Sequence, residues 1–278
     1  MRNRICTLFI VLAVFLCLGA CSKAGSDSSF GIQFIDVGQG DSALVECDGH
    51  YMLVDGGDTS AGDKVYSVLE ERGIQRLDIL AVSHLHADHI GGLTKALSYA
   101  SKIDLTISNA SDGNTEVFRK FEHQLGINGS RISIPHTGDK YKLGTADVEV
   151  IDVSSEDEND SLVLLVTYGS TRFLFTGDIG KNKQSQLAER YMNESDKPFK
   201  INLMKMPHHG GDATILFIRT FMPDYAVVSV GRGNQYGHPF TETLDMLEQA
   251  DAKVYRTDLN GDITVKSDGK QLTFETSK

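Results

Sequence analysis

The body of this chain has almost no cysteine. Four cysteines occur in 278 residues, and Cys47 is the only one after position 21. A single cysteine in the body cannot form an intrachain disulfide. Cys47 lies in the apolar run 42–47, so we expect a small buried side chain without a chemical role.

Clusters of basic residues are also absent. Lys and Arg number 27 against 38 Asp and Glu, which gives a formal net charge of −11, and the longest charged run, 156–160, is acidic. Proteins that bind long duplex nucleic acid usually carry a basic patch. The composition therefore argues against tight binding of long duplex DNA. A nuclease is still compatible with it, because bound metal ions supply positive charge locally.

No apolar run is long enough for a confident transmembrane helix, which needs about 20 residues. The longest, 5–20, follows two arginines and ends in Leu18-Gly19-Ala20-Cys21, which resembles a bacterial lipobox. We therefore expect a lipoprotein signal peptide over 1–20, an acylated Cys21 and a flexible Ser/Gly-rich tether over 21–29. The predicted location is extracytoplasmic, lipid-anchored to a bacterial membrane. An ordinary secretory signal cleaved nearby is the alternative.

The segment 84–89 (HLHADH) places three imidazoles and one carboxylate within six residues. It follows the apolar, strand-like run 77–83, and Gly91-Gly92 come soon after. Neutral imidazole and carboxylate are ligands of Zn²⁺, Mn²⁺ and Fe. The sequence therefore predicts a metal site on the loop after a strand.

The spacing within this segment suggests two ions. On an extended loop His84 and His86 point the same way and can share one ion. Asp88 and His89 follow where the chain turns, and can reach a second ion. Neither pair completes a four-coordinate site, so further ligands must come from distant positions.

Two distant segments offer those ligands. Asp178 ends Thr176-Gly177-Asp178 after the strand-like run 171–176, and a carboxylate there suits a bridge between two cations. His208 and His209 follow the strand-like run 201–206, and one of them would join Asp88 and His89. The sequence leaves open which one.

Strands and helices alternate along the body, which supports an α/β fold. The expected strands are 31–37, 42–47, 51–55, 77–83, 103–107, 146–153, 161–168, 172–176, 201–206, 225–230, 253–256, 262–266 and 271–275, and the expected helices are 61–72, 92–100, 115–125, 182–191 and 242–249. No tandem repeat or internal linker interrupts them, so residues 30–278 are expected to form one domain.

The metal motifs occur along the chain in the order 84–89, 176–178 and 208–210. In these residues and in this order they resemble the motifs of the metallo-β-lactamase superfamily. The similarity is greater to one branch, the extracytoplasmic hydrolase domain of ComEC competence proteins and its stand-alone relatives. The segments that carry it are 34–42 (FIDVGQGDS), 53–57 (LVDGG), 159–164 (NDSLVL) and 236–239 (YGHP). The resemblance implies an αββα sandwich, a metal-dependent hydrolase and two divalent ions, with Zn²⁺ favoured and Mn²⁺ as the alternative.

The chain departs from the superfamily pattern at one position. Many members carry another histidine shortly before the Gly-Asp strand, but the segment 154–161 has none. Oxygen from Asp157, Asn159 or Asp160 could replace it and would shift the preference toward Mn²⁺. The alternatives are a weakly held ion with three protein ligands, or recruitment of His136.

Other residues are expected to support the site. The resemblance implies that an aspartate near the first strands holds the metal loop, and Asp55 is the best match, with Asp41 a further candidate or a turn residue. His238 could protonate a leaving group, hold a substrate phosphate or simply stabilise its loop. Asp88 and His238 are the predicted catalytic residues.

The expected chemistry needs no serine or cysteine nucleophile, and no Ser-His-Asp arrangement is evident. Two cations sharing a water would lower its pKa, and the bridging hydroxide would attack phosphorus or a carbonyl carbon. A phosphodiesterase or nuclease is favoured, because the resembling branch is linked with DNA processing, and short or single-stranded DNA is the candidate substrate. The alternatives are an esterase or lactamase acting on surface polymers, and a non-catalytic surface binding protein. No protein partner can be read from the sequence.

Overall fold

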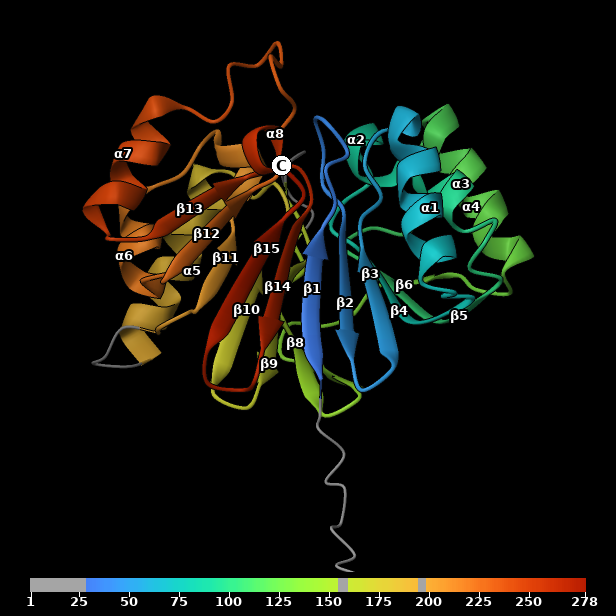
Figure 1. The fold of residues 1–278 in the computed structure, drawn as a ribbon, viewed down its shortest axis with the longest axis horizontal. Coiled ribbons are helices and arrows are strands. Elements are labelled where there is room, and N and C mark those ends of the chain that lie inside the picture. The colour runs from blue at the N-terminus through green and yellow to red at the C-terminus, as the bar shows by residue number, and fades with distance from the viewer. Residues whose placement is uncertain (1–28, 155–159, 195–198) are drawn as a thin grey trace, which may run out of the picture.

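Two β-sheets pack face to face in this computed structural model, and helices cover their outer faces (Figure 1). The structure describes residues 29–154, 160–194 and 199–278. The predicted α/β sandwich in one domain is confirmed. The predicted signal peptide, Cys21 and nearly all of the tether lie outside the described residues. Within the described ranges, no helix has the length and apolar character needed to cross a membrane.

The first sheet has eight strands in the order β15-β14-β1-β2-β3-β4-β5-β6. It is antiparallel from β15 to β3 and parallel from β3 to β6. Its strands are β1 (Phe30–Phe34), β2 (Ala43–Cys47), β3 (His50–Val54), β4 (Arg76–Val82), β5 (Lys102–Ser108), β6 (Ile132–Ser133), β14 (Ile263–Ser267) and β15 (Leu272–Thr276). The helical segments of this half are η1 (Thr59–Ala61), α1 (Gly62–Glu71), α2 (Ala87–Ile90), α3 (Leu93–Ala96) and α4 (Glu116–Ile127).

The second sheet has seven strands in the order β13-β12-β11-β10-β9-β8-β7, with β10 to β13 parallel. Its strands are β7 (Lys140–Leu143), β8 (Ala146–Asp152), β9 (Val163–Tyr168), β10 (Thr171–Phe175), β11 (Leu203–Lys205), β12 (Tyr225–Val228) and β13 (Lys253–Arg256). Its helical segments are α5 (Lys181–Glu194), η2 (Pro207–Gly210), α6 (Ile215–Phe221), α7 (Thr241–Gln249) and α8 (Thr257–Asn260).

Aromatic side chains fill the space between the sheets. Phe30 stacks on Tyr168 and Phe173 with ring centroids 5.0 and 4.8 Å apart, and Phe34 stacks on Phe175 at 6.0 Å. Residues two apart on β1 point the same way, which places Phe30 and Phe34 in this layer. Burying each such ring stabilises the fold by about 1.5–3 kcal/mol. Cys47 is fully buried in the same layer, as expected.

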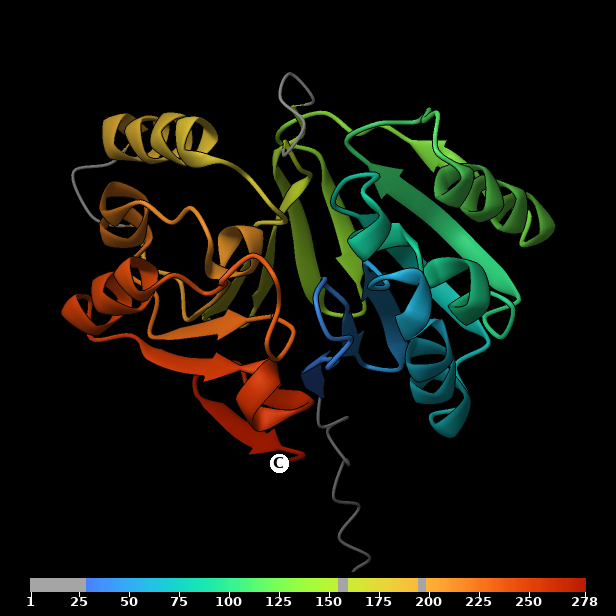
Figure 2. The same cartoon turned by 90° about the horizontal axis from the view of Figure 1, so that it is seen from above.

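Several strands end at one edge of the sandwich. The connections that leave β1, β3, β4, β10, β11 and β12 meet there, and Figure 2 shows the first and last of them side by side when seen from above. Ligand sites of open α/β sheets form at the carboxyl ends of strands. The fold therefore brings the predicted metal motifs, which are far apart in sequence, to one place.

Candidate metal centre

The metal motif is held by the two loops that precede it in sequence. The backbone N–H of Ser83 donates to Asp55 Oδ1 at 2.7 Å, and the N–H of Gly56 donates to the carbonyl of His89 at 2.7 Å. Gly40, at φ +135°, approaches so closely that a Cβ there would lie 2.3 Å from the carbonyl oxygen of Asp88. Only glycine fits this contact. The backbone of the motif is thus fixed before any ion binds.

Four side chains converge where these loops meet. Asp178 Oδ2, after β10, lies 3.2 Å from His89 Nε2 and 3.3 Å from His209 Nε2. His209 Nε2, after β11, also lies 3.3 Å from Asp88 Oδ2. The four ligand atoms all lie within 4.8 Å of one another. Two imidazole nitrogens and two carboxylate oxygens form a donor set that Zn²⁺ or Mn²⁺ accepts.

The Nδ1 atoms of both imidazoles have hydrogen-bond partners, as is usual for histidines that bind a metal ion through Nε2. His89 Nδ1 lies 3.0 Å from Asp55 Oδ2, and His209 Nδ1 lies 2.9 Å from the carbonyl oxygen of Ser229. Such contacts fix a protonated Nδ1 and leave Nε2 for the ion. The buried residues therefore fit a divalent cation. Asp55 occupies the supporting position that the sequence suggested.

The charges around this cluster also favour a cation. Burial alone would lower the pKa of His89 and His209, but Asp178, with Asp55 or Asp41, raises both well above the ordinary value. Burial would raise the pKa of Asp178, but the positive charges of His209, His89 and Lys205 hold it well below its usual range. A binding metal ion must therefore displace protons from the two rings.

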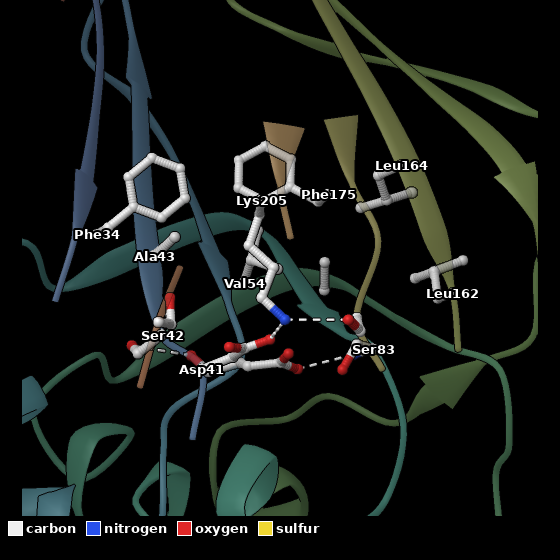
Figure 3. A pocket seen from close by; sticks show the side chains of 14 residues that line it. Phe34, Asp41, Ser42, Ala43, Val54, Ser83, Leu162, Leu164, Phe175 and Lys205 are labelled. Atoms are coloured by element: carbon white, nitrogen blue, oxygen red, sulfur yellow. Dashed lines mark hydrogen bonds and ion pairs between the residues drawn. The ribbon is translucent and has the colours of Figure 1, made fainter. Parts of the chain in front are cut away.

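A buried lysine lies beneath the cluster. Lys205, at the end of β11, is 3% exposed and reaches across the gap between the sheets to the carboxylate of Asp41 (Figure 3). Its Nζ also donates to the carbonyl oxygen of Gly177 at 3.0 Å and lies 3.5 Å from Asp178 Oδ1. Asp178 thus turns one oxygen toward the lysine and the other toward the histidines.

Lys205 was not among the site residues predicted from the sequence. A signal was present, because one lysine interrupts the otherwise apolar end of the run 201–206. A charged residue in a buried strand requires a partner of opposite charge. Asp41, predicted as a supporting residue, is that partner, and its Oδ1 also lies 3.3 Å from His209 Nδ1.

The predicted pair for the other ion lies beside the cluster. The ring of His84 is 4.1 Å from that of His89 and 4.5 Å from that of His86, centroid to centroid. Among the described residues, neither His84 nor His86 joins a group of three or more His, Cys, Asp or Glu ligand atoms within 4.8 Å. His84 Nδ1 lies near the hydroxyls of Ser83 and Ser161, at 3.1 and 3.4 Å, and its buried Nε2 has no hydrogen-bond partner. The described residues thus form one complete four-donor set.

The sequence left open which of the two adjacent histidines joins the cluster. The structure places His209 in the cluster, whereas His208 turns toward His238, with ring centroids 5.2 Å apart, and its Nδ1 lies 3.7 Å from Asp212 Oδ2. The ring of His238 itself is 6.3 Å from that of His209. Burial and the neighbouring histidines lower the pKa of His238, so its ring is neutral at neutral pH.

Of the oxygen ligands proposed to replace the missing histidine, only Asp160 lies in the described residues. Asp160 is buried, and its backbone oxygen accepts from Asn109 Nδ2 at 2.6 Å, but it belongs to no group of clustered ligand atoms in the described part of the chain. Asp157 and Asn159 lie outside the described residues. The exposed His136, with Nδ1 3.6 Å from Asp139, is not part of the cluster.

Comparisons with known proteins give a matching family, sequence relatives and a similar solved structure. The family model described as the metallo-beta-lactamase superfamily matches residues 35–232. ComE operon protein 3 of Bacillus subtilis is 28% identical over 97% of this chain and 36% of that protein. Competence protein ComA of Neisseria gonorrhoeae is 26% identical over 90% of this chain and 34% of that protein, so the chain spans about a third of these relatives. The metallo-beta-lactamase fold protein YhfI of Bacillus subtilis superposes with a TM-score of 0.57 at 13% identity, covering 86% of this chain and all of that one.

The two adjacent histidines provide a test of the cluster. We expect His209→Ala to weaken binding of Zn²⁺ or Mn²⁺ more than about 100-fold, because loss of a supporting group alone costs 10–100-fold. His208→Ala is the matched control and should change the affinity by only a few-fold. Isothermal titration calorimetry measures both. Equal losses in the two variants would contradict the assignment of His209 as the ligand.

Lys205 should be needed for stability when no metal is bound. Lys205→Met leaves Asp41 and Asp178 buried without their ammonium partner, so we expect the free energy of unfolding to fall by about 3–5 kcal/mol. Added Zn²⁺ should restore part of it, since a cation that binds only the folded state stabilises that state. Lys200→Met, which removes an exposed lysine 2.6 Å from Asp224, should have little effect. Urea unfolding with chelator and with metal measures both, and a Lys205→Met variant as stable as Lys200→Met would refute this role.

Proposed function

Because the chain belongs to the metallo-β-lactamase superfamily, we propose that it is a metal-dependent hydrolase of phosphodiester bonds, a phosphodiesterase or nuclease. The observation that carries the proposal is the cluster of Asp88, His89, Asp178 and His209, whose ligand atoms lie within 4.8 Å of one another. Metal sites of this donor type support hydrolysis without a side-chain nucleophile. Either Zn²⁺ or Mn²⁺ suits the set.

Each residue has a defined part in this proposal. A bound divalent cation supplies Lewis acidity and lowers the pKa of a water molecule. Asp88, His89, Asp178 and His209 hold the cation, and Asp55 orients the ring of His89. His238 lies beside the cluster and, as an uncharged ring, contacts the phosphate or the leaving group of the substrate.

One comparison supports the preference for phosphodiesters, and the charge of the chain narrows the substrate class. One matched relative is named a competence protein, and competence is the uptake of DNA. The net charge of −11 and the lack of basic runs disfavour long duplexes. We therefore propose short or single-stranded DNA as the substrate class.

The first test is hydrolysis of bis(p-nitrophenyl) phosphate with metal content measured on the same sample. We expect turnover that requires Zn²⁺ or Mn²⁺ and that falls at least about 100-fold in Asp178→Ala, since this change removes a ligand and leaves Lys205 without one of its partners. Asp147→Ala is the matched control. Asp147 forms an exposed ion pair with Lys142 on the β7–β8 hairpin and should leave turnover near the wild-type rate.

Other outcomes would redirect the proposal. Bound metal without phosphodiester turnover would favour an ester or lactam of a surface polymer, tested with p-nitrophenyl acetate and nitrocefin. A wild-type protein that binds no metal would refute catalysis and leave a binding role. Equal loss of turnover in Asp178→Ala and Asp147→Ala would point to general destabilisation.

We also propose that the protein is extracytoplasmic and lipid-anchored to a bacterial membrane through Cys21. The support is the sequence Leu18-Gly19-Ala20-Cys21 after the apolar run 5–20. Labelling bacterial cells that express the chain with an alkyne fatty acid should tag the wild type and not Cys21→Ser. An unlabelled wild type, or an equally labelled variant, would refute the anchor.

A further inference from the structure

Two exposed aromatic rings lie close to the metal centre. The connection between β12 and α7 rises at the same edge of the sandwich as the connection between β1 and β2 (Figure 1). It carries Tyr236, which is 57% exposed, and Phe240, which is 37% exposed. They are the two aromatic members of the exposed large hydrophobic side chains among the described residues. Exposed apolar side chains that gather beside a site can form a binding surface.

The ring of His238 connects these two rings to the metal ligands. Its centroid is 5.7 Å from that of Tyr236, nearly parallel at 28°, and 5.0 Å from that of Phe240, edge-on at 79°. The same ring lies 6.3 Å from the ring of His209. The aromatic row therefore runs from the cluster to the surface, where more than half of Tyr236 is exposed.

Hydrogen bonds from side chains stabilise the loop that carries the aromatic row. Asn234 donates from Nδ2 to the carbonyl oxygens of Gly231 and His238, at 3.0 and 2.7 Å, and its Oδ1 accepts from the backbone N–H groups of Tyr236 and His238. The N–H of Gly231 donates to Gln39 Oε1 at 3.1 Å, which ties the loop to the β1–β2 connection. A preorganised surface binds its ligand at a lower entropic cost.

We propose that Tyr236 and Phe240 form a stacking platform for the bases of single-stranded nucleic acid next to the scissile phosphodiester. The inference rests on the proposed function, because a base held on the platform places its own backbone near the metal ligands. Stacking on aromatic rings binds bases with little sequence preference. Double-stranded DNA keeps its bases stacked on one another, so the platform selects single strands or ends.

Two features favour a nucleobase over a sugar ring. The amide of Asn234, which could bind sugar hydroxyls, is already used inside the loop. The exposed Arg232 forms no ion pair with any residue in the described ranges, and a guanidinium both stacks on bases and binds phosphate. In a chain of net charge −11, stacking also provides affinity that does not depend on a basic groove.

Fluorescence offers a direct binding test, because the chain contains no tryptophan. Tyr236→Trp introduces a single indole on the platform. We titrate the metal-free variant with a ten-residue oligodeoxythymidylate, so that no hydrolysis occurs, and with an abasic oligomer of the same length. The expected result is quenching of the indole by the thymidylate, with an affinity at least about 10-fold above that for the abasic oligomer.

Two results would overturn the platform. One is the absence of quenching, and the other is equal affinity for both oligomers, which would show that only the backbone is bound. Quenching by a glycosylated poly(glycerol phosphate) but not by thymidylate would identify a sugar-binding surface instead. A far-UV circular dichroism spectrum equal to that of the wild type shows that the variant is folded.

Steady-state kinetics separate this inference from the proposed function. Tyr236→Ala should raise KM for a single-stranded oligonucleotide about 10-fold more than KM for bis(p-nitrophenyl) phosphate, and Tyr236→Phe should restore the wild-type ratio. Ile127→Ala, at an exposed position on α4, is the control. An unchanged KM ratio in Tyr236→Ala refutes the platform even if hydrolysis is present. Absence of hydrolysis by the wild type refutes the proposed function, and the fluorescence test still decides on the platform.

Discussion

The ion pair between the ammonium of Lys205 and the carboxylates of Asp41 and Asp178 joins the two sheets at the metal centre. Lys205 belongs to the second sheet and Asp41 to the loop after β1 of the first. A buried charge is costly unless it is paired and hydrogen-bonded, so these residues fix one another's positions. Asp178 is consequently held with Oδ2 toward His89 and His209, which is the orientation that a ligand needs.

The arrangement of strands explains why distant motifs meet. Helix α2 after β4 supplies Asp88 and His89, the turn after β10 supplies Asp178, and η2 after β11 supplies His209. Because these strands end at the same edge of the sandwich, each short connection adds one or two ligands. The aromatic row on the β12–α7 connection uses the same edge, so the residues for metal and for substrate share one set of supports.

Much of this could be predicted, and the remainder depended on features that a sequence does not display. The apolar run 77–83 and the ligand spacing after it predicted β4 and the metal loop. The sequence could not choose between His208 and His209, because the choice depends on two successive residues with positive φ, 48° and 54°. Helix α6 was not predicted, since its sequence ILFIRTF is an apolar run without clear helical periodicity.

The serine that accompanies His84 helps to explain the difference between the two predicted metal sites. Ser161 Oγ accepts from the N–H of Asp178 at 2.9 Å and lies 3.4 Å from His84 Nδ1, so the hydroxyl orients the ring through its outer nitrogen. The four-donor set gains two carboxylates that balance a cation, whereas His84 and His86 bring only neutral donors. Asp112 and Asp160 line the same pocket as His84 and His86, but among the described residues no three ligand atoms gather there within 4.8 Å of one another. Charge balance therefore favours filling the Asp88–His89–Asp178–His209 set first.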